Sequence, residues 1–550
     1  MADRSQSVAV GTFAALRLQM FAVLLTVQLA NATAVWVHVV TVQWTLTARG
    51  ESATVVSMAP AAMALPFLLL ALPVGAVVGF ASRERMLSAA MVASALSAVA
   101  AAVLSAGGAA HAALLVATVI VVGAGLVVVG VAWQSLLPDL VDRQLLPSAT
   151  VLDGAIYNVS RAVGPLLAGV GLGLVGPAWT FLGTSILFAL GGTVVLFIQM
   201  RRPGRRHARR PLYREMVDGL RFARYSPWTR KLLFRMVMFG LPASALWALV
   251  SLVVHDRLDL GSQGFGVLMA LVGSGAVLAT FVLPPLRRRL SVAAFAAWGS
   301  LAYAATLLTM GLSTSGALVG CVLVLGGVAW VGVQSTWMML AHQALPDWVR
   351  PRIIALLLFL FQGTQAVGSL LWGVAADMVG LPAALVGAAV MMVVSILVLL
   401  RAGLGSSVGI EPDLAEVDAL AHGELDTAHE GALVVRYDYQ VEPSRSGEFA
   451  AAMAALRLSR LRLGARGWSL RPAPGRPGVF VETYQVSSRR EFLEQESGRL
   501  TVPEQRLRTA AQAAALHVRG PQTIPAHLWE DRTDGRDQQS PEKEISDDYR

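Results

Sequence analysis

The sequence predicts an all-α membrane protein in which twelve spanning helices form two six-helix halves, followed by a ferredoxin-like α/β domain. Three observations support this fold class: long apolar segments, an internal repeat, and a change of composition after residue 401. The chain has 550 residues, of which 55% are hydrophobic and only 14% are charged. Soluble domains carry about 25% charged residues. Because the apolar residues are concentrated in residues 1–405, we expect lipid to solvate this part.

A helix needs about 20 mostly apolar residues to cross the hydrocarbon core of a bilayer. The first such segment is too long for the apolar region of a signal peptide and lacks a clear cleavage site, so we expect a retained helix. The single cysteine, Cys321, lies in an apolar stretch and is interpreted as core filling. The predicted spans are residues 14–40, 53–80, 87–107, 112–137, 149–173 and 179–200, then 231–254, 264–286, 292–312, 316–341, 353–376 and 382–401.

The arginine residues between the spans predict which side of the membrane each loop faces, because cytoplasmic loops are enriched in Lys and Arg. With the N-terminus inside, the outside loops contain only Arg49 and Arg257, so both termini are expected in the cytoplasm. The net charge of +9 is therefore interpreted as a topology signal rather than as nucleic-acid binding. The inside loops contain Arg83, Arg85, Arg143, Arg287, Arg288, Arg289, Arg350 and Arg352, and the central loop contains Arg201, Arg202, Arg205, Arg206, Arg209 and Arg210.

Composition divides the chain into two halves, a connecting loop, a linker, a soluble domain and a disordered end. The connecting loop is basic and either fixes the topology or binds anionic lipid head groups. Its amphipathic stretch at 211–225 is expected to lie along the membrane surface. The abundance of Ala and Arg indicates a high-GC bacterium, and hence its cytoplasmic (inner) membrane. The predicted boundaries are 1–200 and 231–401 for the halves, 201–230 for the loop, 402–430 for the linker, 431–530 for the soluble domain and 531–550 for the disordered end.

Parts of the two halves repeat one another in sequence. Each copy follows the fourth span of its half, so the sequence predicts a parallel duplication of a six-helix unit. The matching segments are residues 137–141 (Leu-Pro-Asp-Leu-Val) with 345–349 (Leu-Pro-Asp-Trp-Val), residues 162–164 with 366–368 (both Ala-Val-Gly), and Gly176 with Gly380.

A six-plus-six parallel repeat joined by a long basic loop resembles the Major Facilitator Superfamily, in which two halves rock around a site near the bilayer midplane. Residues 146–149 (Leu-Pro-Ser-Ala) and 158–165 resemble the fifth helix of the branch that contains the enterobactin-type siderophore exporters. The Leu-Pro motifs at 65–67 and 72–76 are similar to the same branch. The resemblance covers nearly the whole chain and implies a secondary transporter that works by alternating access.

The resemblance also implies a cytoplasmic gate after the second span. Gly75, Arg83 and Arg85 match the family's glycine and basic residues, whereas Gly79 stands where the family usually has an aspartate. This sequence therefore departs from the family at the aspartate latch. In the second half, Arg350 and Arg352 resemble the family's Arg-Gly-Arg, with a proline between them.

Gly164, Pro165 and Gly169 resemble a helix-five motif of exporters in this superfamily. Small residues let helices approach closely, and an internal proline removes a backbone donor and bends the helix. The motif predicts a gating role between the halves, with simple helix packing as the alternative.

Ionisable and polar residues inside the membrane are the candidates for the substrate path, because they are costly to bury there. Asp153, Tyr157 and Arg161 are spaced four apart and share one face of the fifth span, with Asn158 beside them. Arg161 is expected to meet an anionic substrate group or a gating acid, or else to face away from the path. Asp153 lies close enough to the membrane edge that an interfacial role competes with proton carriage.

The first and eleventh spans add further polar candidates. Gln28, Asn31 and His38 share a face of the first span, and either line the path or form helix–helix hydrogen bonds. His38 could titrate near neutral pH, although proton coupling rests on the resemblance rather than on a carboxylate in an obvious position. Gln362 and Gln365 occupy the position in the second half that corresponds to Arg161, and they suit a broad amphipathic substrate.

The order of elements after the linker is β-α-β-β-α-β, which predicts a ferredoxin-like fold. The domain resembles the dimeric α/β barrels related to antibiotic-biosynthesis monooxygenases. Trp468, Glu482, Tyr484 and Glu494 supply no nucleophile–base pair and no metal cluster, so a dimerisation or ligand-sensing module is favoured over an enzyme and over an inert appendage. The predicted strands are 433–441, 468–471, 479–486 and a short final segment, and the predicted helices are 446–463, 489–500 and 502–516.

The leading hypothesis is a secondary exporter of small organic molecules such as a siderophore, a drug or a secondary metabolite. Uptake by the same fold remains an alternative, and a membrane-tethered sensor or enzyme that acts through the soluble domain is another. Neither a phosphate-binding loop nor a nucleotide-binding domain is recognisable, so ATP is not expected to drive transport and no cofactor is predicted. The expected partners are the substrate, the bilayer, protons and a second copy of the chain.

Overall fold

The computed structural model of the chain describes residues 13–77, 82–107, 111–142, 144–198, 212–402, 413–415 and 431–529. These residues divide into two compact units, each described here by itself. The bundle unit comprises Met1–Leu212, Leu233–Met338 and Leu357–Gly403, and the tail unit comprises Tyr213–Leu232, Met339–Leu356 and Leu404–Arg550. The predictions for Arg143, Gly79, the basic run 201–210 and the segments 403–412, 416–430 and 531–550 lie outside the described residues.

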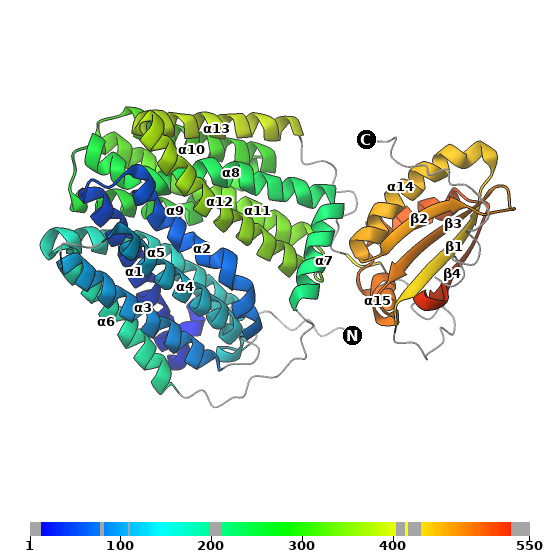
Figure 1. The fold of residues 1–550 in the computed structure, drawn as a ribbon, viewed down its shortest axis with the longest axis horizontal. Helices are drawn as coiled ribbons and strands as arrows, with labels where there is room; N and C mark the ends of the chain where they lie inside the picture. Colours follow the sequence, from blue (N-terminus) through cyan, green and yellow to red (C-terminus); the bar gives the residue numbers. More distant parts are fainter. Residues whose placement is uncertain are drawn as a thin grey trace. The chain divides into compact units, whose positions relative to one another are not determined.

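Each predicted span corresponds to one long helix (Figure 1). The helices of the first half are α1 (Gln19–Ala48), α2 (Ala53–Val77), α3 (Arg83–Ala106), α4 (Ala112–Leu140), α5 (Leu146–Leu174) and α6 (Gly176–Phe197). The helices of the second half are α8 (Pro227–Leu252), α9 (Ser262–Arg289), α10 (Val292–Leu312), α11 (Gly316–Ala344), α12 (Arg350–Val379) and α13 (Leu381–Ala402).

Within the described ranges, 11 helices are long and apolar enough to cross a membrane. The long helix of the bundle that does not meet this requirement is α5, which carries Asp153, Asn158 and Arg161. Large apolar side chains point outward on both halves, among them Leu96 (66% exposed) and Phe281 (72% exposed). The chain is therefore a multi-pass membrane protein whose apolar surface faces lipid, as predicted.

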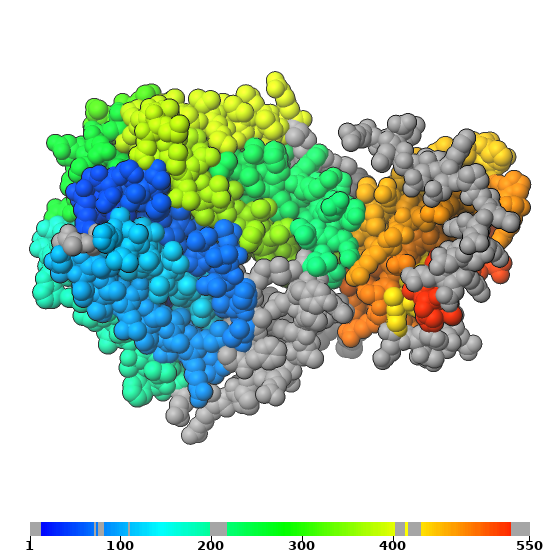
Figure 2. Space-filling model, in the orientation of Figure 1, coloured from blue at the N-terminus to red at the C-terminus, as the bar shows by residue number. Residues whose placement is uncertain are grey.

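The two halves repeat the same arrangement. In the first half α3 packs against α6, and in the second half α10 packs against α13. Gly176 and Gly380 have φ angles of 80° and 87° and stand at the starts of α6 and α13, where a left-handed residue lets one helix end and the next begin. The space-filling view shows the blue-to-cyan surface of the first half meeting the green-to-yellow surface of the second half (Figure 2). The predicted parallel duplication is confirmed.

The tail unit contains a four-stranded antiparallel sheet in the order β2-β3-β1-β4. This is the strand order of a ferredoxin-like fold, so the predicted fold class is confirmed. The core between sheet and helices includes Val435, Tyr439, Phe449, Met453 and Tyr484. The elements are β1 (Leu433–Gln440), α14 (Ser446–Leu463), β2 (Arg466–Pro472), β3 (Val479–Val486), α15 (Arg489–Leu493), α16 (Val502–Ala513) and β4 (His517–Pro525).

One predicted helix of the soluble domain is wrong. Instead of a continuous helix over 489–500, α15 ends at Leu493 and a π-helical turn covers Glu494–Gly498. The wider turn brings Gln495 and Glu496 into the interior, where Glu496 forms ion pairs with Arg460 (3.2 Å) and Arg508. Burying a guanidinium without a carboxylate is costly. The two buried arginines therefore favour the irregular turn, because it places the Glu496 carboxylate beside them.

The tail unit also includes α7 (Leu212–Tyr225), the predicted amphipathic helix. One side of its C-terminal part is buried through Phe222 and Ala223, whereas Leu220 is 62% exposed. The ring of Phe222 contacts the ring of Trp348 at 5.6 Å in an edge-on arrangement. Placement of α7 along the membrane surface stays a prediction.

Candidate functional site

Arg161 lies near the middle of α5 and is surrounded by aromatic rings. Its guanidinium carbon is 5.1 Å from the ring centroid of Tyr157, 5.3 Å from that of Trp36 and 5.7 Å from that of Trp247. These rings come from α5, α1 and α8, so both halves contribute. A cation within about 6 Å of an aromatic face is attracted by the ring quadrupole. We call Arg161, Trp36, Tyr157 and Trp247 the arginine box.

Arg161 forms no ion pair with any described carboxylate, and its buried Nε atom has no hydrogen-bond partner in the described part of the chain. An arginine at the middle of a membrane bundle is expensive and marks a functional site by default. Aromatic rings stabilise the cation without neutralising it. The arrangement can therefore accept an anionic group that supplies the missing charge and hydrogen bonds.

An aromatic cluster of the second half extends the box. The Trp247 ring lies 5.5 Å from that of Trp330, which in turn contacts Phe361 at 5.3 Å and Tyr303 at 5.9 Å. Pattern analysis did not single out Trp36, Trp247 or Trp330, because a tryptophan in an apolar span gives no signal beyond hydrophobicity. A cation beside an aromatic wall suits a ligand that combines an anionic group with an apolar body.

The other candidates on α5 are already hydrogen-bonded in part. Asp153 accepts hydrogen bonds from Trp133 Nε1 and Gln134 Nε2, both at 2.8 Å. Asn158 donates to the carbonyl oxygen of Gly154 on the preceding turn. Asp153 is therefore held against α4, while Tyr157 is 43% exposed and faces Arg161.

The polar residues of α1 lie in different environments. His38 is fully buried inside the first half, where its Nε2 atom is 3.0 Å from Thr118 Oγ1 and its ring lies 5.1 Å from that of Phe181. This placement favours helix packing over a position on the path. Asn31 is buried with its Nδ2 atom unbonded to described residues, and Gln28 is half-buried.

The two glutamines of α12 are both half-buried. Gln365 donates to the carbonyl oxygen of Gly240 on α8 at 3.4 Å, a contact within the second half. The structure thus brings Tyr157 and Arg161 together, whereas Gln28, Asn31, Gln362 and Gln365 lie on other helices.

A seam between the halves closes one end of the bundle. Gln43 on α1 donates to the carbonyl oxygens of Trp247 (2.9 Å) and Ala248 (3.3 Å) on α8. One turn on, Thr47 Oγ1 donates to Ser251 Oγ at 2.9 Å. Both contacts lie toward the helix ends that the arginine pattern places outside.

The same end holds a carboxylate that sequence reasoning missed. Asp377 on α12 accepts hydrogen bonds from the backbone nitrogens of Ala53 (2.8 Å) and Thr54 (2.9 Å) and from Thr54 Oγ1 (2.5 Å). A carboxylate of the second half thereby caps the amino end of α2 in the first half, where free backbone N–H groups and the helix dipole favour a negative charge.

The glycine motif of α5 forms a close approach between the halves. A Cβ atom on Gly169 would lie 2.7 Å from the Cα of Gly266 on α9, and one on Gly266 would lie 2.8 Å from the carbonyl oxygen of Pro165. Gly164 instead faces α1, where a Cβ would lie 2.5 Å from the Cβ of Trp36. The motif therefore both seats Trp36 of the arginine box and permits the contact between α5 and α9.

The predicted gate residues make contacts within their own halves or units. Arg83 forms an ion pair with Asp139 (2.5 Å), which belongs to the repeated Leu-Pro-Asp motif, and also donates to the Ser135 carbonyl oxygen. Arg85 is exposed, and Gly75 lies within α2.

The second copy of the Leu-Pro-Asp motif has a comparable ion pair in the tail unit. Arg350 pairs with Asp347 at 2.7 Å and donates from Nη2 to the Leu345 carbonyl oxygen at 2.8 Å. Arg352 donates to the carbonyl oxygen of Trp348 at 2.9 Å. In both halves the motif's aspartate binds an arginine that was predicted to gate.

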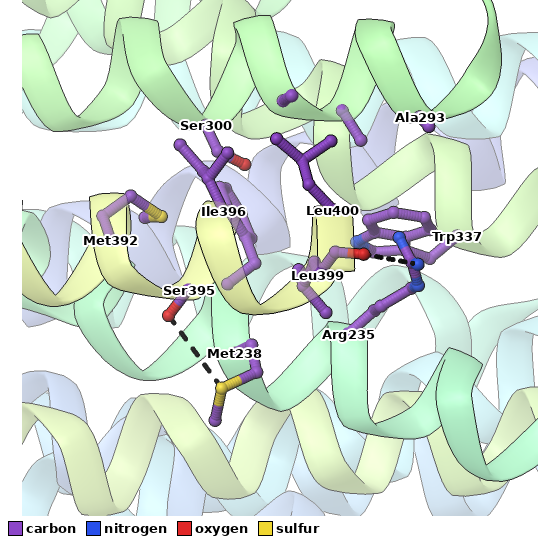
Figure 3. Close-up of a pocket in the computed structure, with 13 residues that line it drawn as sticks. Arg235, Met238, Ala293, Ser300, Trp337, Met392, Ser395, Ile396, Leu399 and Leu400 are labelled. Atoms are coloured by element: carbon purple, nitrogen blue, oxygen red, sulfur yellow. Dashed lines mark hydrogen bonds between the residues drawn. The ribbon is translucent and has the colours of Figure 1, made fainter. Parts of the chain in front are cut away.

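A small pocket lies inside the second half, between α8, α10, α11 and α13 (Figure 3). Arg235 is 4% exposed, donates to the Leu399 carbonyl oxygen at 3.2 Å and lies 5.6 Å from the Trp337 ring. The free volume is about 20 Å³, enough for about one water molecule. Since the first half does not line it, this pocket is distinct from the arginine box.

The polar residues of the soluble domain form a buried structural network. Glu482 accepts hydrogen bonds from Trp468 Nε1 (2.8 Å) and Tyr439 Oη (2.9 Å) and lies 3.5 Å from Arg460. Burial raises the pKa of Tyr484, against the opposing effect of Arg460. Within the described residues, no group of three or more His, Cys, Asp or Glu could hold a metal ion. The carboxylates of this network hold α14 to the sheet.

Comparisons with known proteins bear on the family and on the fold. A family model described as "Transmembrane secretion effector" matches residues 10–533. An uncharacterized transporter of the major facilitator type from Sinorhizobium fredii is 32% identical over 34% of this chain and 49% of its own length. The staphyloferrin A transporter of Staphylococcus aureus is 22% identical over 45% of this chain and 62% of its own length. The chain therefore spans less than two thirds of the curated relatives that it matches.

Solved structures show the same fold at low identity. A bacterial homologue of the human lysosomal transporter Spinster, in an inward-facing and unoccupied conformation, has a TM-score of 0.55 at 14% identity, covering 70% of this chain and 95% of its own. The nucleoside transporter NupG has a TM-score of 0.59 at 10% identity, covering 69% and 98%. These matches show the fold of the bundle, whereas the curated relatives named above are transporters, in line with the prediction that the chain is not an enzyme.

Proposed function

Because the chain belongs to the transmembrane secretion effector family of major facilitator transporters, we propose that it exports small organic anions by alternating access. The observation that carries the proposal is the arginine box, in which a cation that has no carboxylate partner among the described residues is held by rings from both halves. An anion bound there would contact α1 and α5 of one half and α8 of the other. Its arrival or release would therefore alter contacts that differ between the two states of the bundle.

The orientation predicted from the arginines assigns the state of the bundle. Both termini then lie in the cytoplasm of a bacterium, and the seam with Asp377 closes the outer side. This corresponds to an inward-facing state, in which the box would be reached from the cytoplasm. Exporters of this type bind their substrate from the cytoplasmic side, so this state fits an exporter that is ready to bind substrate.

The secretion family and the staphyloferrin A relative favour a siderophore-like or other secreted metabolite as the substrate. A ligand with several anionic groups and an apolar body would match both the cation and the aromatic wall. Proton antiport is the proposed driving force, with Asp153 on α5 as the carboxylate closest in sequence to the box. A second copy of the chain paired through the soluble domain remains a further expectation.

Dye transport in everted bacterial membrane vesicles tests this proposal. Wild-type vesicles energised by respiration should accumulate an anionic amphipathic dye, and a protonophore should abolish the accumulation. Arg161→Gln should lose it, whereas Arg235→Gln, which alters a buried arginine away from the box, should keep it. Accumulation only in right-side-out vesicles would indicate uptake instead. Absence of dye movement in both orientations, with the protein present in the membrane, would overturn the exporter.

A further inference from the structure

The repeated motif differs between the halves at one position. The first copy reads Leu-Pro-Asp-Leu-Val with Leu140 in fourth place, and the second reads Leu-Pro-Asp-Trp-Val with Trp348 there. Leu140 ends α4, while Trp348 lies in the connection between α11 and α12. Transport by two equivalent halves does not require this difference. The contacts of Trp348 within the tail unit supply a reason for it.

The soluble domain contacts the Trp348 ring through Arg499. The guanidinium carbon of Arg499 lies 5.0 Å from the ring centroid, and Arg499 itself is only 5% exposed. Two further bonds orient this side chain: Nη1 donates to the Leu463 carbonyl oxygen and Nη2 to Glu494, both at 2.9 Å. A cation–π contact is stronger when it is shielded from water. Arg499 is therefore a positioned contact and not a mobile surface side chain.

A second contact joins α7 to the same edge of the soluble domain. Arg221 Nη1 donates to the Gly464 carbonyl oxygen at 3.1 Å, at the end of α14. The next residue of α7, Phe222, packs edge-on against Trp348. Gly219 of α7 also lies against Arg352, because a Cβ added to it would be 2.9 Å from the Arg352 Cβ. We call the pairs Arg499–Trp348 and Arg221–Gly464 the tail clamp.

We propose that the tail clamp is an autoinhibitory contact, in which the soluble domain holds α7 and the α11–α12 connection together and thereby slows alternation. Arg350 and Arg352, the predicted gate residues of the second half, lie in the first turn of α12, directly after the connection, and α7 follows the loop that joins the halves. Rocking of the halves must move the gate end of α12. A folded domain attached to both α7 and the connection opposes that movement. The proposal rests on the alternating access proposed above.

The test compares clamp variants of the full-length chain in a Cys321→Ser background. Ser251→Cys places a thiol in the seam between the halves, where Ser251 is fully buried. A membrane-impermeant maleimide should reach it only when the seam opens. Arg499→Ala and Trp348→Leu, which restores the residue of the first copy, should each raise the labelling rate at least about threefold. Arg506→Ala, an exposed arginine of the same domain, should leave the rate unchanged.

The labelling needs no substrate, so it remains informative if the exporter proposal fails. An unchanged or lower rate in both clamp variants would overturn the autoinhibitory contact. Proximity is checked separately by Trp348→Cys with Arg499→Cys in the same background. A short bismaleimide should join the two thiols, and the soluble domain should stay attached after cleavage at a protease site inserted within residues 416–430. Release of the domain despite complete labelling of both thiols would also contradict the proposal.

Discussion

The carboxylate of Asp377 caps α2 of the opposite half, accepting a hydrogen bond from the backbone nitrogen of Ala53 at 2.8 Å. Hydrogen bonds to a charged group contribute about 1.5–3 kcal/mol each. Because the cap and its donors belong to different halves, the bonds exist only while this end of the bundle is closed. Asp377 therefore acts as a latch for the seam.

Asp377→Asn should weaken the latch, because an amide keeps the shape but loses the charge that the helix end favours. We expect maleimide labelling of Ser251→Cys in the Cys321→Ser background to rise about tenfold, the change that corresponds to about 1.4 kcal/mol. Asp256→Asn is the matched control, since Asp256 is exposed and pairs with its neighbour His255. Equal labelling in the two variants would show that Asp377 does not stabilise the closed seam.

The contact between Gly169 and Gly266 leaves no room for a side chain. Gly169→Ala should force α5 and α9 apart, and overpacking of this kind costs about 1–3 kcal/mol. The purified protein should then lose several degrees of thermal stability in detergent. Gly154→Ala, on the same helix but with nothing within 4 Å of an added Cβ, should be neutral or stabilising. A neutral Gly169→Ala would show that the halves do not meet at this contact.

Trp247→Leu should weaken transport of an anionic dye more than Trp298→Leu. Trp247 contributes a ring to Arg161 from the second half, whereas Trp298 is 63% exposed on the outer surface. Loss of a shielded cation–π contact amounts to about 1–2 kcal/mol, or roughly a tenfold change in the apparent affinity for the dye. The apparent KM for dye efflux from cells is the measurement. Similar KM values for the two variants would show that Trp247 does not contribute to dye binding.

Much of the fold follows from local patterns. Apolar length predicted every long helix of the bundle, and the strand predicted at residues 479–486 has the observed bounds of β3. The first span extends to Ala48 and not to residue 40, because hydroxyls near its end bond to the helix itself: Thr41 to the Val37 oxygen and Thr45 to the Thr41 oxygen. Such residues lower the hydropathy without ending the helix.

The site was less predictable than the fold. Spacing identified Tyr157 and Arg161 as neighbours on one face, which the structure also shows. It could not identify Trp247, which comes from another half, nor decide that the face of α1 with His38 packs against Thr118 and Phe181. Asp377 was missed because it lies just beyond the predicted span of residues 353–376. Long-range partners of this kind leave no local sequence signal.

Glu504 predicts a pH dependence in the soluble domain. Burial, against the opposing effect of Arg462, raises the pKa of its carboxyl above the usual glutamate value. The folded domain then holds the proton more tightly than the unfolded chain does. The contribution of Glu504 to stability is therefore greatest at low pH and decreases as the pH rises above about 4.5, the unfolded value.

Glu504→Gln should remove this pH dependence while keeping the capping box with Thr501, since glutamine also serves at that position. Amide hydrogen exchange of α16 in the full-length protein, corrected for intrinsic exchange, is the measurement. Wild-type protection should fall between about pH 4.5 and neutrality, and the variant should show a flatter profile. Glu448→Gln, an exposed glutamate of α14, is the control. Parallel profiles in wild type and Glu504→Gln would assign the effect to another group.

The central claim is that Arg161 recognises an anionic group, and a pair of dyes matched in shape but not in charge tests it most directly. The two dyes have the same apolar body. One carries a carboxylate, and the other carries the corresponding neutral amide. In cells that express the wild type, efflux of the carboxylate should exceed that of the amide, and Arg161→Gln should reduce carboxylate efflux at least about tenfold while changing amide efflux little. Equal losses for both dyes, or unchanged carboxylate efflux in Arg161→Gln, would contradict the account.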